Sequence, residues 1–144
     1  MDHSNIADDR AIMNTLAAFP RVVDGKHWER IGEVFVADIT FDYGDGGEKK
    51  GLDALLEQFR KFHERCSAMQ HLLGSIQLEI DGDSAISRAY VQARHQGKGD
   101  KSSAIFDTHG EYVDQWQRRP EGWRIVRRDA SWSLFAGDPS VLFD

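Results

Sequence analysis

The sequence predicts an α+β domain in which three helices precede a strongly curved antiparallel sheet. Apolar residues recur at helical spacing in three segments before residue 66, whereas β-branched and aromatic residues dominate four long segments after residue 67. Helices that come before the strands, rather than alternating with them, are typical of an α+β fold. With 144 residues the chain is long enough to bury a genuine core, and we expect a single domain over residues 1–144.

The three helices are expected to be separated by turn and strand signals. Residues 6–19 carry the first helical pattern, which should end near Pro20 because proline cannot continue a helix normally. A second, short helix is predicted over residues 27–35, and a third over residues 51–65. Between them, the β-rich residues 36–43 predict a strand followed by a flexible, glycine-rich loop.

Four long strands should follow, joined by tight turns. They are predicted over residues 70–80, 85–96, 105–118 and 122–134. Asp81-Gly82-Asp83 has the composition of a hairpin turn between the first two. Antiparallel strands of this length tend to curl, so the sheet should wrap around the first helix as a half-barrel and enclose a pocket.

Charge and cysteine content argue against several classes of protein. A net charge of -6 argues against a nucleic-acid partner, and the one cysteine allows neither an internal disulfide nor a cysteine-based metal site. The polar start of the chain and the lack of a long apolar run predict a cytoplasmic protein without a membrane partner. One basic cluster is interpreted as a solvated sheet face: Arg118, Arg119, Arg124, Arg127 and Arg128.

One predicted strand carries a candidate site. If His95 points to the concave face, period-two alternation places Ala89, Val91 and Ala93 on that face as well. Three small apolar residues that lead up to an imidazole would leave room for a ligand. A second histidine, His71, lies on the preceding predicted strand, so we expect a cavity with titratable groups at one end.

Four short stretches of the chain share residue types and order with a known family. They are Asp24-Gly-Lys-His-Trp28, Phe41-Asp-Tyr43, Gln70-His-Leu-Leu-Gly74 and Arg94-His-Gln96. In this respect the chain resembles the scytalone dehydratase-like, SnoaL-like members of the NTF2-like superfamily, over nearly its whole length. The resemblance implies a cone-shaped half-barrel, catalytic histidines at His71 and His95, a carboxylate at Asp24 that pairs with His95, and a catalytic Tyr43.

These residue types suit the elimination of water beside a carbonyl group. That reaction needs a base for the α-proton, an acid for the departing hydroxyl and a donor to the enolate oxygen. We expect His71 to perform both proton transfers, His95 to assist as a second acid or hydrogen-bond donor, and Asp24 to fix the tautomer of His95. Tyr43 would donate to the carbonyl oxygen. No metal or organic cofactor is expected.

The positions that would select the substrate depart from the family pattern. Val23 stands where the family has a second tyrosine, and Glu111 and Val113 stand near its substrate-contacting serine and asparagine. A small cyclic or aromatic substrate other than scytalone is therefore expected. The predicted pocket residues are Val23, Trp28, Val91, Ala93 and Val113.

Three alternative functions remain open at this point. A ketosteroid-isomerase-like enzyme could use Asp24 as its base opposite Tyr43, and two histidines with a carboxylate could hold a non-haem iron. The fold could also serve as a non-catalytic module that binds a small molecule. We further expect a homo-oligomer, a trimer or a dimer, and an apolar tail at residues 141–143 that caps the pocket or packs on a neighbour.

Overall fold

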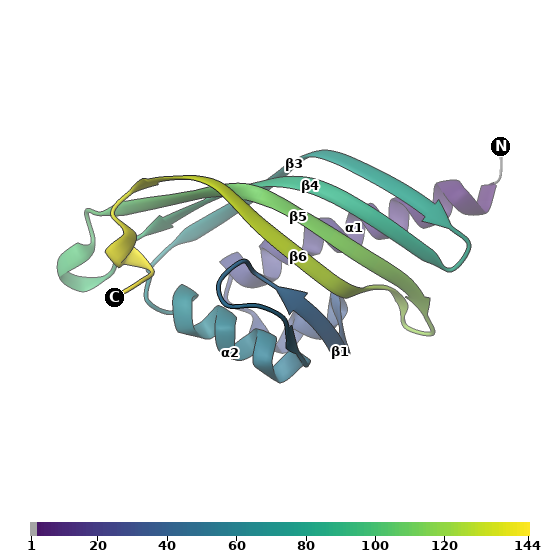
Figure 1. Cartoon of the computed structure of the whole chain (residues 1–144), viewed down its shortest axis with the longest axis horizontal. Helices are drawn as coiled ribbons and strands as arrows, with labels where there is room; N and C mark the ends of the chain where they lie inside the picture. The colour runs from purple at the N-terminus through teal and green to yellow at the C-terminus, as the bar shows by residue number, and fades with distance from the viewer. Residues whose placement is uncertain (1–2) are drawn as a thin grey trace.

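A curved sheet of six strands covers two helices, as the computed structural model of the chain shows (Figure 1). The structure describes residues 3–144. The strands run in the order β2-β1-β6-β5-β4-β3, and the long helices α1 and α2 lie on the concave side of the arch (Figure 1). The α+β half-barrel predicted from the sequence is confirmed. Within residues 3–144, no helix has both the length and the apolar character that a bilayer-spanning segment requires.

The first helix, α1 (His3–Asp24), is longer than the sequence predicts because it passes through Pro20. Proline removes one backbone donor, but the apolar face of the helix continues on both sides of it, and Phe19, Val22 and Val23 are all buried. Burial of that face compensates for the missing hydrogen bond. The additional turn carries Asp24 to the sheet.

The segment between the two long helices contains three short elements. A 3-10 helix, η1 (Trp28–Glu33), replaces the predicted second helix and leads into β1 (Phe35–Asp42). The loop predicted after β1 also forms a two-residue strand, β2 (Lys49–Lys50), which pairs with the end of β1. The second long helix, α2 (Leu52–His63), then begins after Gly51.

The predicted long strands are all present, and their ends extend slightly beyond the predicted bounds. They are β3 (Met69–Asp81), β4 (Ser84–Gln96), β5 (Ile105–Arg119) and β6 (Gly122–Gly137). Each is antiparallel to the next. The sheet as a whole is nevertheless mixed, because β1 runs parallel to β6. No hairpin joins β1 to β6, so its direction is not fixed by a tight turn.

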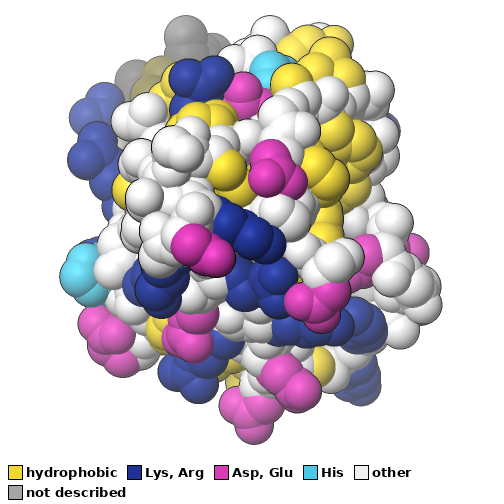
Figure 2. Space-filling model, turned by 90° about the vertical axis from the view of Figure 1, so that its left-hand side faces the viewer, with side chains coloured by type: hydrophobic (Ala, Val, Ile, Leu, Met, Phe, Trp, Pro, Cys, Tyr) yellow, Lys and Arg dark blue, Asp and Glu magenta, His cyan; other side chains and the backbone are white. Residues whose placement is uncertain are grey.

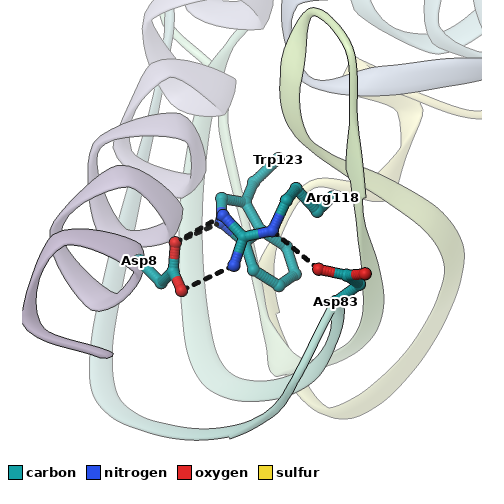
Figure 3. Close-up of polar contacts among 4 residues, drawn as sticks. All are labelled: Asp8, Asp83, Arg118 and Trp123. Atoms are coloured by element: carbon teal, nitrogen blue, oxygen red, sulfur yellow. Dashed lines mark hydrogen bonds and ion pairs between the residues drawn. The ribbon is translucent and has the colours of Figure 1, made fainter. Parts of the chain in front are cut away.

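A polar cluster joins the start of α1 to the sheet where β3 meets β4 and β5 meets β6 (Figure 3). The guanidinium of Arg118 donates to both carboxylate oxygens of Asp8, each at 2.7 Å, and to Asp83 at 2.8 Å. The indole of Trp123 donates to Asp8 at 3.1 Å and lies under the guanidinium. The hydrogen bonds from Arg118 lower the pKa of Asp8. Arg118 thus connects α1 to the turn between β3 and β4. The sequence interpretation, which placed Arg118 on a solvated basic face, did not predict this contact.

Several large apolar side chains remain on the surface. They are Ile6, Leu72, Ile86, Tyr90, Leu134, Phe135 and Phe143. Figure 2 shows hydrophobic side chains gathered in the upper right part of one end of the molecule, with charged groups over much of the rest. The homo-oligomer stays a prediction.

Candidate active site

A carboxylate and an imidazole meet where the end of α1 touches the start of β3. Oδ1 of Asp24 lies 2.6 Å from Nδ1 of His71, and Oδ2 accepts the backbone N–H of the same residue at 2.9 Å. Because an ionised carboxylate only accepts hydrogen bonds, this contact assigns a proton to Nδ1. When the imidazole carries this one proton, the other ring nitrogen, Nε2, has a lone pair.

The predicted partner of Asp24 was wrong: the carboxylate pairs with His71 and not with His95. The reason is the extra helical turn after Pro20, which was not predicted. Helix α1 packs on β3, the edge strand, so its last residue reaches His71 there instead of His95 on the next strand.

His95 is buried at 2% exposure, and its Nδ1 donates to the backbone carbonyl of Phe106 at 2.9 Å. Burial lowers the pKa of His95 to about 4, against the opposing effect of the Phe106 carbonyl. The imidazole is therefore neutral at pH 7, with its one N–H directed at a carbonyl. In this state the other ring nitrogen of His95 can accept a hydrogen bond, whereas the sequence predicted a second acid or a hydrogen-bond donor.

A third histidine, His63, completes the group. As the last residue of α2 it stacks against His95 with 6.0 Å between the ring centroids and lies edge-on to His71 at 5.7 Å. Burial, with smaller effects of the other two histidines and Lys26, holds its pKa well below the usual value. The candidate residues chosen from the sequence do not include His63, although it lies four residues after Phe59, one turn further along the buried face of α2.

Tyr43 contacts a buried ion pair. Its hydroxyl accepts a hydrogen bond from Nη1 of Arg128 at 3.3 Å, while Nε and Nη2 of Arg128 donate to the carboxylate of Asp114 at 2.7 and 2.8 Å. Burial raises the pKa of Tyr43, although the Arg128 charge opposes the rise. The hydroxyl is therefore protonated at neutral pH and free to donate. Arg128 was wrongly assigned to a solvated face, since neither it nor Asp114 is exposed.

Aromatic rings enclose the guanidinium of Arg128. Its central carbon lies 3.9 Å from the ring centroid of Tyr112, 4.2 Å from that of Phe19 and 5.1 Å from that of Phe35. Such rings attract a cation through their negative faces. Together with Asp114, they hold a positive charge inside the core beside the Tyr43 hydroxyl.

The three histidines and Tyr43 line a cavity of about 230 Å³. That volume lies below the roughly 300–1,000 Å³ of drug-sized sites, so the cavity suits a small molecule. Much of the remaining wall is aromatic: Phe19, Phe59, Phe62, Tyr112, Trp132, Phe135 and Phe143. Leu142 and Phe143, from the C-terminal tail, also line the cavity.

The five residues predicted to form the substrate pocket lie off its wall: Val23, Trp28, Val91, Ala93 and Val113. Val23 is fully buried in the core, and Trp28 stacks behind the wall on Phe59 and His63. Val113 lies on the face of β5 opposite to the buried residues that point inward.

Phe19 explains why the small residues of β4 leave no open space. Val91, Ala93 and His95 share the buried face of β4, as predicted. Ala93 pairs with His71 on one side of β4, and Ala89 pairs with Tyr112 on the other. The ring of Phe19 contacts both His71 and Tyr112, so it lies over this stretch of β4. A core side chain thus occupies the space that the sequence interpretation gave to a ligand.

The family is decided by a match between the SnoaL-like domain and residues 4–129. The chain belongs to the SnoaL-like family. This family places the half-barrel in the NTF2-like superfamily, as the resemblance implied.

Solved structures with the same fold include enzymes. A candidate aromatic ring hydroxylase from Novosphingobium aromaticivorans is 26% identical, with a TM-score of 0.83, and the match covers 94% of this chain and 96% of that one. A candidate scytalone dehydratase from the same organism is 20% identical, with a TM-score of 0.85 and coverage of 94% and 91%. A hexachlorocyclohexane dehydrochlorinase from Novosphingobium barchaimii is 16% identical, with a TM-score of 0.83 and coverage of 100% and 99%.

Proposed function

We propose that this SnoaL-like protein is a cofactor-independent hydro-lyase that removes water from a small cyclic hydroxy-ketone, with His71 as its base. The observation that carries the proposal is the Asp24–His71 pair at the wall of a largely aromatic cavity. A carboxylate on Nδ1 orients an imidazole and stabilises the imidazolium that forms when Nε2 takes a proton. The family and the fold support an NTF2-like protein that processes a small molecule.

The reaction begins when Nε2 of His71 removes a proton from the carbon next to the carbonyl group. The electron pair of the broken C–H bond forms an enolate, and the hydroxyl of Tyr43 donates a hydrogen bond to its oxygen. When the enolate collapses, the β-carbon loses its hydroxyl, which takes the proton from Nε2. One water leaves and His71 returns to its starting state, so a single histidine serves as base and then as acid.

His95 and Arg128 assist in this scheme without transferring a proton. Neutral His95 accepts a hydrogen bond from the substrate hydroxyl and so orients the leaving group toward His71. Arg128 donates to the Tyr43 oxygen, which strengthens the phenol as a donor. Both effects use groups that are fixed by protein contacts before the substrate arrives.

Two of the structural neighbours favour elimination over isomerisation. Their names describe a dehydratase and a dehydrochlorinase, and the removal of water or of hydrogen chloride needs a base beside a leaving group. An isomerase that used Asp24 as its base is less compatible with this site, because both oxygens of Asp24 bind His71.

Product analysis with a matched variant tests the proposal. Purified protein in EDTA is incubated with a panel of cyclic β-hydroxyketones, beginning with 3-hydroxycyclohexanone, and products are followed by enone absorbance and by mass. We expect the mass to fall by one water, and His71→Asn to lower kcat roughly 100-fold or more. His27→Asn, at an exposed histidine, is the control. Full activity of His71→Asn, or a product of unchanged mass, would contradict the mechanism.

A further inference from the structure

The three histidines of the cavity form a compact set of nitrogen donors. One ring nitrogen from each of His63, His71 and His95 lies within 4.8 Å of the other two. We propose that these three side chains bind a divalent transition-metal ion of the Zn²⁺ type, and that the ion competes with the substrate proton for His71. This metal site goes beyond the proposed elimination, which needs no metal.

Two of the three imidazoles already have the outer contacts of metal ligands. A metal-bound histidine usually donates its other ring N–H to a carboxylate or a backbone carbonyl, which fixes the tautomer and the ring direction. His71 does so through Nδ1 to Asp24, and His95 through Nδ1 to the carbonyl of Phe106. In both residues, Nε2 is left as the donor to an ion.

The spacing requires only modest movement of the rings. A tetrahedral ion with metal–nitrogen bonds of about 2.0–2.1 Å separates its ligand nitrogens by about 3.4 Å. The third ring, His63, is the one with the least to lose by moving, because its Nδ1 is buried without a hydrogen-bond partner in the part of the chain that the structure describes. Its ring stacks on Trp28 and Phe59, and within residues 3–144 no hydrogen bond of Nδ1 would be broken if the ring shifted toward the ion.

The donor set favours a borderline metal over a hard one. Three imidazoles suit Zn²⁺, Cu²⁺ or Ni²⁺, whereas Mg²⁺ and Ca²⁺ prefer oxygen ligands. The iron site considered from the sequence required Asp24 as a ligand, but its oxygens are directed at His71 instead. His63 takes the third position, and the cavity supplies room for a fourth ligand.

Metal binding and proton abstraction exclude one another at His71. Its Nδ1 is committed to Asp24, so Nε2 is the nitrogen that either the ion or the substrate proton must use. Occupancy by the metal should therefore inhibit elimination in proportion to the fraction of protein that is loaded. Binding itself does not depend on the protein having that activity.

Cobalt titration tests the site directly. Co²⁺ is added to the metal-free full chain while its visible d–d absorption is recorded, and Zn²⁺ is then used to displace it. We expect one ion to bind per chain. The affinity should fall in His63→Asn and in His95→Asn by more than the roughly 10- to 100-fold that is typical when a residue hydrogen-bonded to a metal ligand is replaced. His27→Asn should bind as the unmodified protein does. An absence of stoichiometric binding, or equal binding by His63→Asn, would overturn the proposal.

A second measurement does not depend on variants that fold. The imidazole resonances of the unmodified protein are followed by NMR during a Zn²⁺ titration. Those of His63, His71 and His95 should move together, and those of His27 should not; movement of His27 alone would count against the site. Activity measured in parallel separates the two proposals. Activity lost in EDTA and restored by Zn²⁺ would refute both metal-free elimination and the competition at His71, whereas the titration would still show whether the three histidines bind the ion.

Discussion

Replacement of Asp24 by asparagine is the most informative change to this site. The carboxylate accepts two hydrogen bonds from His71, one from the ring Nδ1 and one from the backbone N–H. Asparagine has the same shape but a single acceptor oxygen, and its second group is a donor. If that oxygen keeps the backbone N–H, the amide NH₂ faces Nδ1. Nδ1 can accept a hydrogen bond from this NH₂ only if the ring proton moves to Nε2.

That tautomer removes the lone pair which the proposed base requires. In the Ser-His-Asp triad, the equivalent exchange of aspartate for asparagine lowers kcat by about 10,000-fold with little change in geometry. Asp24→Asn should therefore lower kcat by roughly 1,000- to 10,000-fold. The free energy of unfolding should change far less, since the shape and one of the two hydrogen bonds are kept.

Two assays follow the two parts of this argument. Nitrogen NMR of the His71 ring reports whether Nδ1 or Nε2 carries the proton, and kcat is measured with the hydroxy-ketone that the unmodified protein converts. Asp24→Glu is a useful comparison because it keeps the charge but lengthens the side chain. The reasoning is refuted if Asp24→Asn shows Nε2 protonated and still turns over at the original rate.

Three further predictions concern stability. Because burial lowers the pKa of His95 to about 4, the unfolded chain takes up this proton at a higher pH than the folded chain does. The free energy of unfolding should therefore fall by about 3 kcal/mol more between pH 7 and pH 4 than it does in His95→Gln, as measured by urea denaturation. Arg128→Met should cost about 3–5 kcal/mol because it leaves the carboxylate of Asp114 buried without its cation, and the double variant with Asp114→Leu should recover most of that loss in the same assay. Gly110→Ala should lower the melting temperature, because a Cβ there would lie 2.0 Å from a carbonyl oxygen of β6. The melting temperature of Gly74→Ala, where the space is open, should stay close to that of the unmodified protein.

Local patterns in the sequence predict most of the fold. Helical and alternating periods locate both long helices and the four long strands, and they assign His95 to the inner face of its strand. The parallel pairing of β1 with β6 was missed, because side-chain alternation carries no information on strand direction. The length of α1 was missed because the rule that proline ends a helix is local, whereas burial of the helix against the sheet is not.

The candidate site is predictable only in part. The sequence singled out His71 and Tyr43, and the structure places both on the cavity wall with His95. The pairing of Asp24 and the contribution of His63 depend on where two helices end relative to the sheet. Arg128 looked like one member of a surface cluster, and only its buried contact with Asp114 distinguishes it. The catalytic role of these residues stays a prediction.

The two hydrogen bonds of Asp24 also make the proposed base a reporter of tertiary assembly. Asp24 and His71 lie 47 positions apart in the chain and meet only when the end of α1 has docked on β3. A partly folded chain could hold every helix and strand and still contain an imidazole with no orienting carboxylate. During refolding, the rate of elimination should therefore recover with helix docking and lag behind the circular dichroism signal of the helices.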